Sequence, residues 1–234
     1  MSSETLMPGA GIARRPMHLI IVADCSGSMA GERIQALNFA VADMLPHLAE
    51  WEAEQERADV MVRVLGFATE PFWHVQEPTP VARMRWKPLR AVDRGRTNLG
   101  AALRVVADEL RPDKLERRAL RPAIVLITDG RPTDRPEDLE AGFRAIQEVP
   151  AAKAALRLAV AIGRDARSEE ATRFIGDPDV PVLLADKTDE IADRLIVASI
   201  AVSRLSEVGA DRAMLVQQIL GQQGAVDYEG ETIV

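Results

Sequence analysis

The chain has 234 residues, of which 47% are hydrophobic and 28% charged, a composition typical of a folded globular protein and not of a disordered or fibrous one. The 29 basic and 36 acidic side chains give a net charge of −7, which argues against general binding to nucleic acids or anionic membranes. No apolar run approaches the ~20 residues that cross a bilayer, so we expect no membrane span.

The length suits one large α/β domain between two short ends. Residues 1–16 are rich in Gly, Pro and Ser and lack periodicity, so we expect a flexible N-terminal arm there. The domain is expected over 17–208, followed by a C-terminal tail over 209–234 with too few large apolar residues for a second core. A single cysteine, Cys25, and the lack of an apolar signal core near the start favour a cytoplasmic location.

Buried strands and amphipathic helices alternate along the first half of the domain. Residues 18–23 form a run that is aliphatic throughout after His18, typical of a strand buried on both faces of a parallel sheet. Apolar residues at helical spacing follow over 32–51, although Pro46 is expected to bend or break the later turns. The next predicted elements are a strand at 60–67, a short edge strand at 73–75, a Pro-rich surface connection at 78–88 and a helix at 99–110.

The same alternation continues in the second half. A wholly aliphatic strand at 123–127 is followed by a helix whose start, at Asp134 and Glu137, is similar to a capping box. The remaining predicted elements are strands at 156–162 and 180–184 and helices at 168–175 and 188–208. The pattern predicts an α/β fold with a doubly wound, mostly parallel sheet, helices on both faces and one short antiparallel edge strand.

Polar residues follow the predicted strands at the edge where open parallel sheets bind ligands. Asp24, Ser26 and Ser28 come after the first strand, Thr97 lies at the end of the long connection, and Asp129 comes after the strand at 123–127. Two carboxylates and three hydroxyls are hard oxygen ligands, suited to Mg²⁺ or Mn²⁺ at a site that keeps several waters. The sequence therefore predicts a divalent-metal site at this edge.

These residues resemble the metal-ion-dependent adhesion site of the von Willebrand factor A family, and the resemblance covers about 17–208. It implies that Ser26 and Ser28 coordinate the metal directly, that Thr97 does so when a ligand is bound, and that Asp24 and Asp129 act directly or through water. It also implies Mg²⁺ as the ion, with Mn²⁺ or Ca²⁺ as alternatives. A protein partner would supply an acidic side chain to the remaining coordination position, with a shift of the helix at 188–208.

Within that family, three stretches are most similar to the bacterial cytoplasmic TerY type, which is associated with tellurite resistance and phosphorylation pathways. The stretches are 95–100, 127–134 and 160–163. This similarity implies a role in stress or phosphorylation-linked signalling, with kinase or phosphatase pathway proteins as partners.

Familiar enzyme patterns fail on this sequence. A Cys-phosphatase loop would need Arg where Gly31 stands, and haloacid-dehalogenase chemistry would need a second Asp where Ser26 stands. Cys25 is expected to be a small buried core residue and not a nucleophile. We therefore predict a non-enzymatic, metal-dependent protein-recognition module; a metal-assisted phosphoryl or ester hydrolase using Asp24 and Asp129 is the alternative, and an inert scaffold comes third.

Overall fold

A computed structural model describes residues 14–54, 57–163, 169–178 and 180–185. The predicted helix at 188–208 and the tail at 209–234 lie outside the described residues, as does almost all of the N-terminal arm. The described strands are β1 (Arg15–Asp24), β2 (Ala58–Phe67), β3 (Pro71–Pro80), β4 (Ala123–Thr128), β5 (Leu156–Ile162) and β6 (Leu183–Ala185). The helices are α1 (Glu32–Glu54), α2 (Leu99–Glu109), α3 (Pro136–Glu148), α4 (Pro150–Ala154) and α5 (Glu169–Ile175), with 3-10 turns at η1 (Gly27–Met29) and η2 (Val81–Arg83).

The strands form one sheet in the order β3-β2-β1-β4-β5-β6. All neighbouring pairs are parallel except β2 and β3, which are antiparallel. The predicted doubly wound α/β fold with an antiparallel edge strand is thus confirmed. The edge strand is longer than the predicted 73–75, because an edge position tolerates the prolines that end it.

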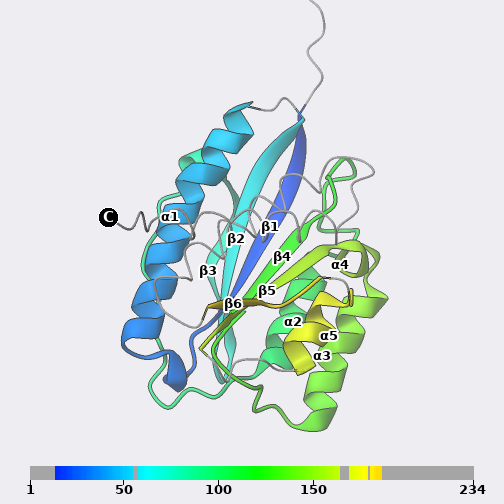
Figure 1. Cartoon of the computed structure of the whole chain (residues 1–234). Helices are drawn as coiled ribbons and strands as arrows, with labels where there is room; N and C mark the ends of the chain where they lie inside the picture. Colours follow the sequence, from blue (N-terminus) through cyan, green and yellow to red (C-terminus); the bar gives the residue numbers. More distant parts are fainter. Residues whose placement is uncertain (1–13, 55–56, 164–168, 179, 186–234) are drawn as a thin grey trace, which may run out of the picture.

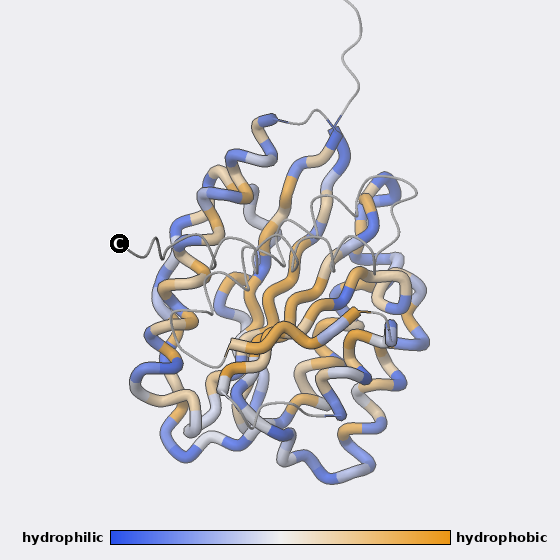
Figure 2. The backbone as a smooth tube through the Cα atoms, in the orientation of Figure 1, coloured by the Kyte–Doolittle hydropathy of each residue, from blue (hydrophilic) through white to orange (hydrophobic). Residues whose placement is uncertain are grey.

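Helices cover both faces of the sheet. In Figure 1, α1 lies on one side of the strands, and α2, α3 and α5 lie on the other. Figure 2 shows hydrophobic residues concentrated along the central strands and hydrophilic ones over the outer helix surfaces. Because β1 and β4 lie in the middle and are buried along almost their whole length, their ends are fixed firmly in space. Of the described helices, none combines the length and the apolar composition that a membrane span requires.

The expected break at Pro46 does not occur, since α1 is continuous from Glu32 to Glu54. Proline leaves the carbonyl four residues earlier without its helical hydrogen bond. That carbonyl belongs to Ala42, which is exposed like Pro46, so water can satisfy it. On the opposite face, buried Met44 and Leu48 hold the helix against the sheet.

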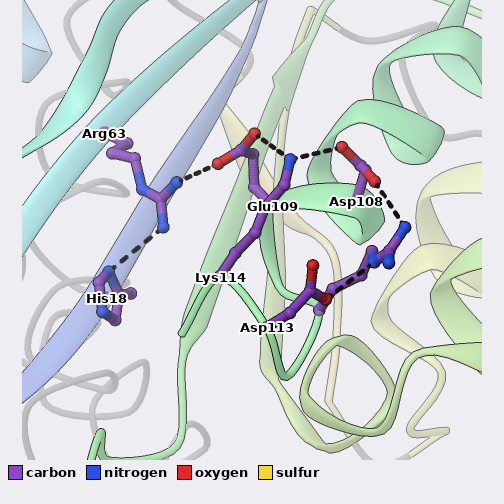
Figure 3. Close-up of polar contacts among 7 residues, drawn as sticks. His18, Arg63, Asp108, Glu109, Asp113 and Lys114 are labelled. Atoms are coloured by element: carbon purple, nitrogen blue, oxygen red, sulfur yellow. Dashed lines mark hydrogen bonds and ion pairs between the residues drawn. The ribbon is translucent and has the colours of Figure 1, made fainter. Parts of the chain in front are cut away.

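A buried polar network lies at the opposite end of the sheet from the predicted metal site. His18 of β1 and Arg63 of β2 are only 1% and 3% exposed. His18 contacts Glu116 Oε2 through Nε2 at 2.7 Å. Its Nδ1 lies 3.4 Å from the Arg63 guanidinium, which donates to Glu109 Oε2 of α2 at 2.7 Å (Figure 3). Lys114 bridges Glu109 to further surface charges. The network ties the first two strands to the end of α2.

Acidification should weaken the fold through His18. Burial lowers the pKa of its imidazole below 6.5, although Glu116 opposes the shift. Below pH 6.5 the unfolded state therefore binds more protons than the folded state, and stability should fall by at most about 1.4 kcal/mol per pH unit. Urea unfolding between pH 7.5 and 5.5 measures this slope, which should be smaller in His18→Gln. The exposed His47→Gln serves as the control; a slope unchanged by His18→Gln would contradict this role.

Candidate functional site

The ends of β1 and β4 meet at the predicted metal site. The two strands pair in parallel, with Ala23 beside Ile127, so the next residue of each strand lies at the same edge. The carboxylate of Asp24 is fully buried there. Its Oδ1 accepts the Ser26 N–H at 2.8 Å, and its Oδ2 accepts the Thr128 hydroxyl at 2.7 Å. Asp24 thus ties the loop after β1 to the end of β4.

Two serine hydroxyls and the second carboxylate form a row beside Asp24. Ser26 precedes the 3-10 turn η1, and Ser28 lies within it. Ser26 Oγ lies 3.0 Å from Ser28 Oγ, which donates to Asp129 Oδ1 at 2.9 Å. The structure therefore brings together four of the five residues that the sequence predicted: Asp24, Ser26, Ser28 and Asp129.

The fifth residue, Thr97, reaches the same edge through its backbone. Its N–H donates to Thr133 Oγ1 at 2.9 Å, and its carbonyl accepts the Thr133 N–H at 2.9 Å. In the same loop, the Gly95 carbonyl accepts the Gly27 N–H at 3.0 Å. Thr97 also lines a small hollow of about 10 Å³ with Thr128 and other residues of this edge. The buried Thr97 is thus held close to the end of β4.

Asp134 does not cap its own helix, so the predicted capping box at Asp134 and Glu137 is wrong. Its Oδ2 and Oδ1 accept the N–H groups of Leu99 and Gly100 at 2.8 and 2.9 Å, which caps α2 instead. The reason is the close packing of α2 on α3: a Cβ added to Gly100 would lie 2.4 Å from the Asp138 carbonyl oxygen. Asp134 thereby fixes the start of the helix that follows Thr97.

Arg33 contacts the site although the sequence did not predict it, as does Thr128 through its hydrogen bond to Asp24. The Arg33 guanidinium forms an ion pair with Asp129 Oδ2, and the Asp129 side chain is fully buried. Gly31, with φ at +82°, turns the chain between η1 and α1 and so places Arg33 on the first turn of the helix. The sequence does place a basic residue shortly after the two serines, but the side chains of such residues usually point to solvent.

Burial sets the protonation chemistry of the site. Desolvation raises the pKa of Asp24 above its usual value, with a smaller contribution from the charge of Asp129, while hydrogen bonds from Ser26 and Thr128 oppose the shift. Burial also raises the pKa of the Cys25 thiol to about 12. Because the thiolate is the nucleophilic form, Cys25 is unreactive at neutral pH, as expected for a core residue.

The spacing of the oxygens fits a small divalent cation. In an octahedral Mg²⁺ site with ligands at about 2.1 Å, neighbouring ligand oxygens lie about 3.0 Å apart. The Ser26–Ser28 and Ser28–Asp129 oxygen separations are 3.0 and 2.9 Å. Within the described residues, no three His, Cys, Asp or Glu side chains lie close enough together to hold a metal ion by themselves, so any cation here would depend on hydroxyl ligands as well.

One family model and several solved structures are similar to this chain. Residues 19–132 match the family model of the von Willebrand factor type A domain, and this span includes all five residues. No curated protein is a significant match to the chain. Residues 19–132 are therefore similar to a von Willebrand factor type A domain, and the sheet has the fold of solved structures of that kind.

Several solved structures share the fold. A von Willebrand factor type A protein from Catenulispora acidiphila has a TM-score of 0.64 and 16% identity over 81% of this chain and 43% of its own. The ArnB paralog VWA2 from Sulfolobus acidocaldarius has a TM-score of 0.56 and 15% identity over 80% and 46%. Proximal thread matrix protein 1 from the mussel byssus, in a form with a zinc-occupied adhesion-site motif, has a TM-score of 0.60 and 15% identity over 81% and 48%. This chain therefore spans less than half the length of these relatives.

Removing the positive charge of Arg33 should strengthen cation binding at this edge. Arg33→Gln leaves Asp129 without its ion-pair partner and takes away a repulsive charge, so the affinity for Mn²⁺ should rise by about three- to tenfold, the size expected for a half-exposed charge. Isothermal titration with MnCl₂ measures the change. The control is Arg111→Gln, an exposed arginine in the charge cluster at the other end of α2. Equal affinities in the wild type and Arg33→Gln would contradict the arrangement.

Proposed function

We propose that this chain is a non-enzymatic protein-recognition module that depends on a divalent metal. Ser26 and Ser28 would hold the ion directly, Thr97 would join them when a partner binds, and Asp24 and Asp129 would act directly or through water. Mg²⁺ is the proposed ion, with Mn²⁺ or Ca²⁺ as alternatives. When bound, the ion supplies an electrophilic position for an acidic side chain of the partner.

The observation that carries the proposal is the row of oxygens from Ser26 through Ser28 to Asp129, at separations of 3.0 and 2.9 Å. Both oxygens of Asp24 already accept hydrogen bonds from Ser26 and Thr128, so Asp24 serves chiefly to hold this row in place. A cation held mainly by neutral hydroxyls keeps most of its charge. An incoming carboxylate therefore gains more than at a site filled by carboxylates.

The cellular role rests on the sequence. The stretches at 95–100, 127–134 and 160–163 support a TerY-like type, and with it a cytoplasmic role in tellurite resistance or phosphorylation-linked signalling. Partners would then be proteins of kinase or phosphatase pathways. The net charge of −7 disfavours nucleic acid as a partner.

The alternative is a metal-assisted phosphoryl or ester hydrolase that uses Asp24 and Asp129. A general base must reach the proton that it abstracts, but Asp24 is fully buried under hydrogen bonds from Ser26 and Thr128. Asp129 is paired with Arg33. We therefore expect no turnover of p-nitrophenyl phosphate or p-nitrophenyl acetate with Mg²⁺ present. Turnover that is lost in Asp129→Ala would establish the hydrolase instead.

Mg²⁺ should stabilise the protein through this site. A ligand at ten times its dissociation constant adds about 1.4 kcal/mol, which raises the Tm of a domain of this size by about 4 °C. Thermal unfolding with MgCl₂ or EDTA measures the shift. Asp24→Ala should abolish it.

Two further variants show whether Asp24→Ala acts through the metal site or through a general effect on the fold. Ser28→Ala removes a hydroxyl of an exposed residue and should also abolish the shift, while Asp93→Ala, an exposed acid of the neighbouring loop, should keep it. Equal Mg²⁺ stabilisation in the wild type, Asp24→Ala and Ser28→Ala would rule out the assignment.

Partner binding should require the metal and Thr97. Proteins captured from the source cell in MgCl₂ should be released by EDTA, because the metal forms the bond to the partner's carboxylate. Thr97→Ala should weaken capture more than it weakens Mg²⁺ binding, since its hydroxyl joins the ion when the partner is bound. The two are compared by quantitative mass spectrometry and by titration. Capture that persists in EDTA would place the interaction on another face.

A further inference from the structure

A polar hollow of about 220 Å³ lies directly beside the Thr97 loop. It is lined by the turn between β2 and β3, the start of α2 and the start of α3. Six charged residues contribute to its wall: Arg96, Arg104, Arg135, Glu70, Asp134 and Asp138. The hollow therefore contains three basic and three acidic groups, and its binding properties depend on which of these are already neutralised.

Three of the six charges are engaged within the protein. The carboxylate of Asp134 accepts two backbone N–H groups at the start of α2, at 2.8 and 2.9 Å. Arg135 donates through Nε to Asp138 Oδ2 at 2.8 Å, which pairs these two residues. Because these three side chains are already engaged, none of them provides the main contact to a ligand.

In the described residues the other two arginines donate to backbone carbonyls. The hydrogen bond from Arg135 lowers the pKa of the Asp138 carboxylate, and the charge of Arg104 also helps to lower it. Arg96 donates to the Thr133 carbonyl at 2.6 Å, and Arg104 donates to the Asp138 carbonyl at 3.2 Å. In the part of the chain that the structure describes, neither has a carboxylate within ion-pair distance. Each guanidinium carries five N–H donors, so both arginines keep donors for a ligand, and neither charge is taken up by an ion pair among the described residues. Both side chains belong to exposed residues at the wall of the hollow.

We propose that this hollow binds a second acidic side chain of the same protein partner, held by Arg96 and Arg104, while a first acidic side chain binds the metal. The proposal rests on the metal-dependent recognition proposed above. Arg96 directly precedes Thr97, and both contact Thr133, so the hollow and the metal site share one loop. The three acidic groups of the wall balance its three basic groups, so the hollow has no net positive charge that would favour a dianion, and a monoanionic carboxylate can use the N–H donors of the two arginines.

The hollow can be tested without the metal, by NMR titration of the ¹⁵N-labelled protein in EDTA. The probe is acetyl-aspartate methylamide, with acetyl-asparagine methylamide as the neutral control. The aspartate probe should shift the backbone amide signals of Thr69 and Ala101, and its affinity should fall at least fivefold in Arg96→Gln/Arg104→Gln. Glu70→Gln should bind it about twofold more tightly, and the control Arg111→Gln should behave like the wild type.

Three results would overturn the anion site. These are equal affinities in the wild type and Arg96→Gln/Arg104→Gln, equal shifts from the neutral probe, and tighter binding of inorganic phosphate than of the aspartate probe. Addition of MgCl₂ separates this proposal from the metal-dependent function. With Mg²⁺, the aspartate probe should produce a second set of shifts at the Ser28 and Gly130 amides. Asp24→Ala should remove this second set and leave the metal-free set in place. Absence of the second set in the wild type refutes the metal-dependent function, whereas absence of the metal-free set in the wild type refutes the hollow.

Peptides with two aspartates test whether both sites serve one partner. In MgCl₂, blocked peptides with zero to five glycines between the two aspartates should include at least one that binds tenfold more tightly than the single-aspartate probe. The gain should disappear in Arg96→Gln/Arg104→Gln. If no spacing gives a gain in the wild type, the two sites do not act together and the proposal is wrong.

Discussion

The buried carboxylate of Asp24 is the interaction on which the functional edge depends. One of its oxygens holds the loop after β1, and the other holds Thr128 at the end of β4. A carboxylate without water is unfavourable unless its oxygens are satisfied, and these two hydrogen bonds also fix where the serines lie. Because β1 and β4 are the central pair of the sheet, the resulting row of oxygens is supported from both sides.

Helix α2 connects this edge to the rest of the molecule. Its start is capped by Asp134 from the loop before α3, and Thr97 comes two residues before the helix begins. Its last residue, Glu109, binds the buried Arg63 at the opposite end of the sheet. The hollow beside Thr97 lies along the first turns of the same helix. A partner that binds both the metal and the hollow would therefore contact one rigid element.

The sequence predicted the parts that follow from local pattern. Aliphatic runs located the central strands, and the polar residues after them are brought to one edge, as the parallel arrangement requires. It did not predict Arg33 on Asp129 or Asp134 on α2, because both contacts join residues far apart in the chain, and their side chains would suit solvent or a local cap equally well. The unbroken α1 through Pro46 was missed for a similar reason, since packing on the sheet outweighs one lost hydrogen bond.

Anomalous diffraction from crystals soaked in MnCl₂ tests the metal site most directly, because Mn²⁺ scatters anomalously and substitutes for Mg²⁺. An anomalous peak is expected at about 2.2 Å from the hydroxyl oxygens of Ser26 and Ser28, with Asp129 beside it and one coordination position open to solvent or to a carboxylate of a neighbouring molecule. A wild-type crystal at saturating MnCl₂ with no peak at these two serines, or with its peak on other residues, would contradict a metal site at the ends of β1 and β4.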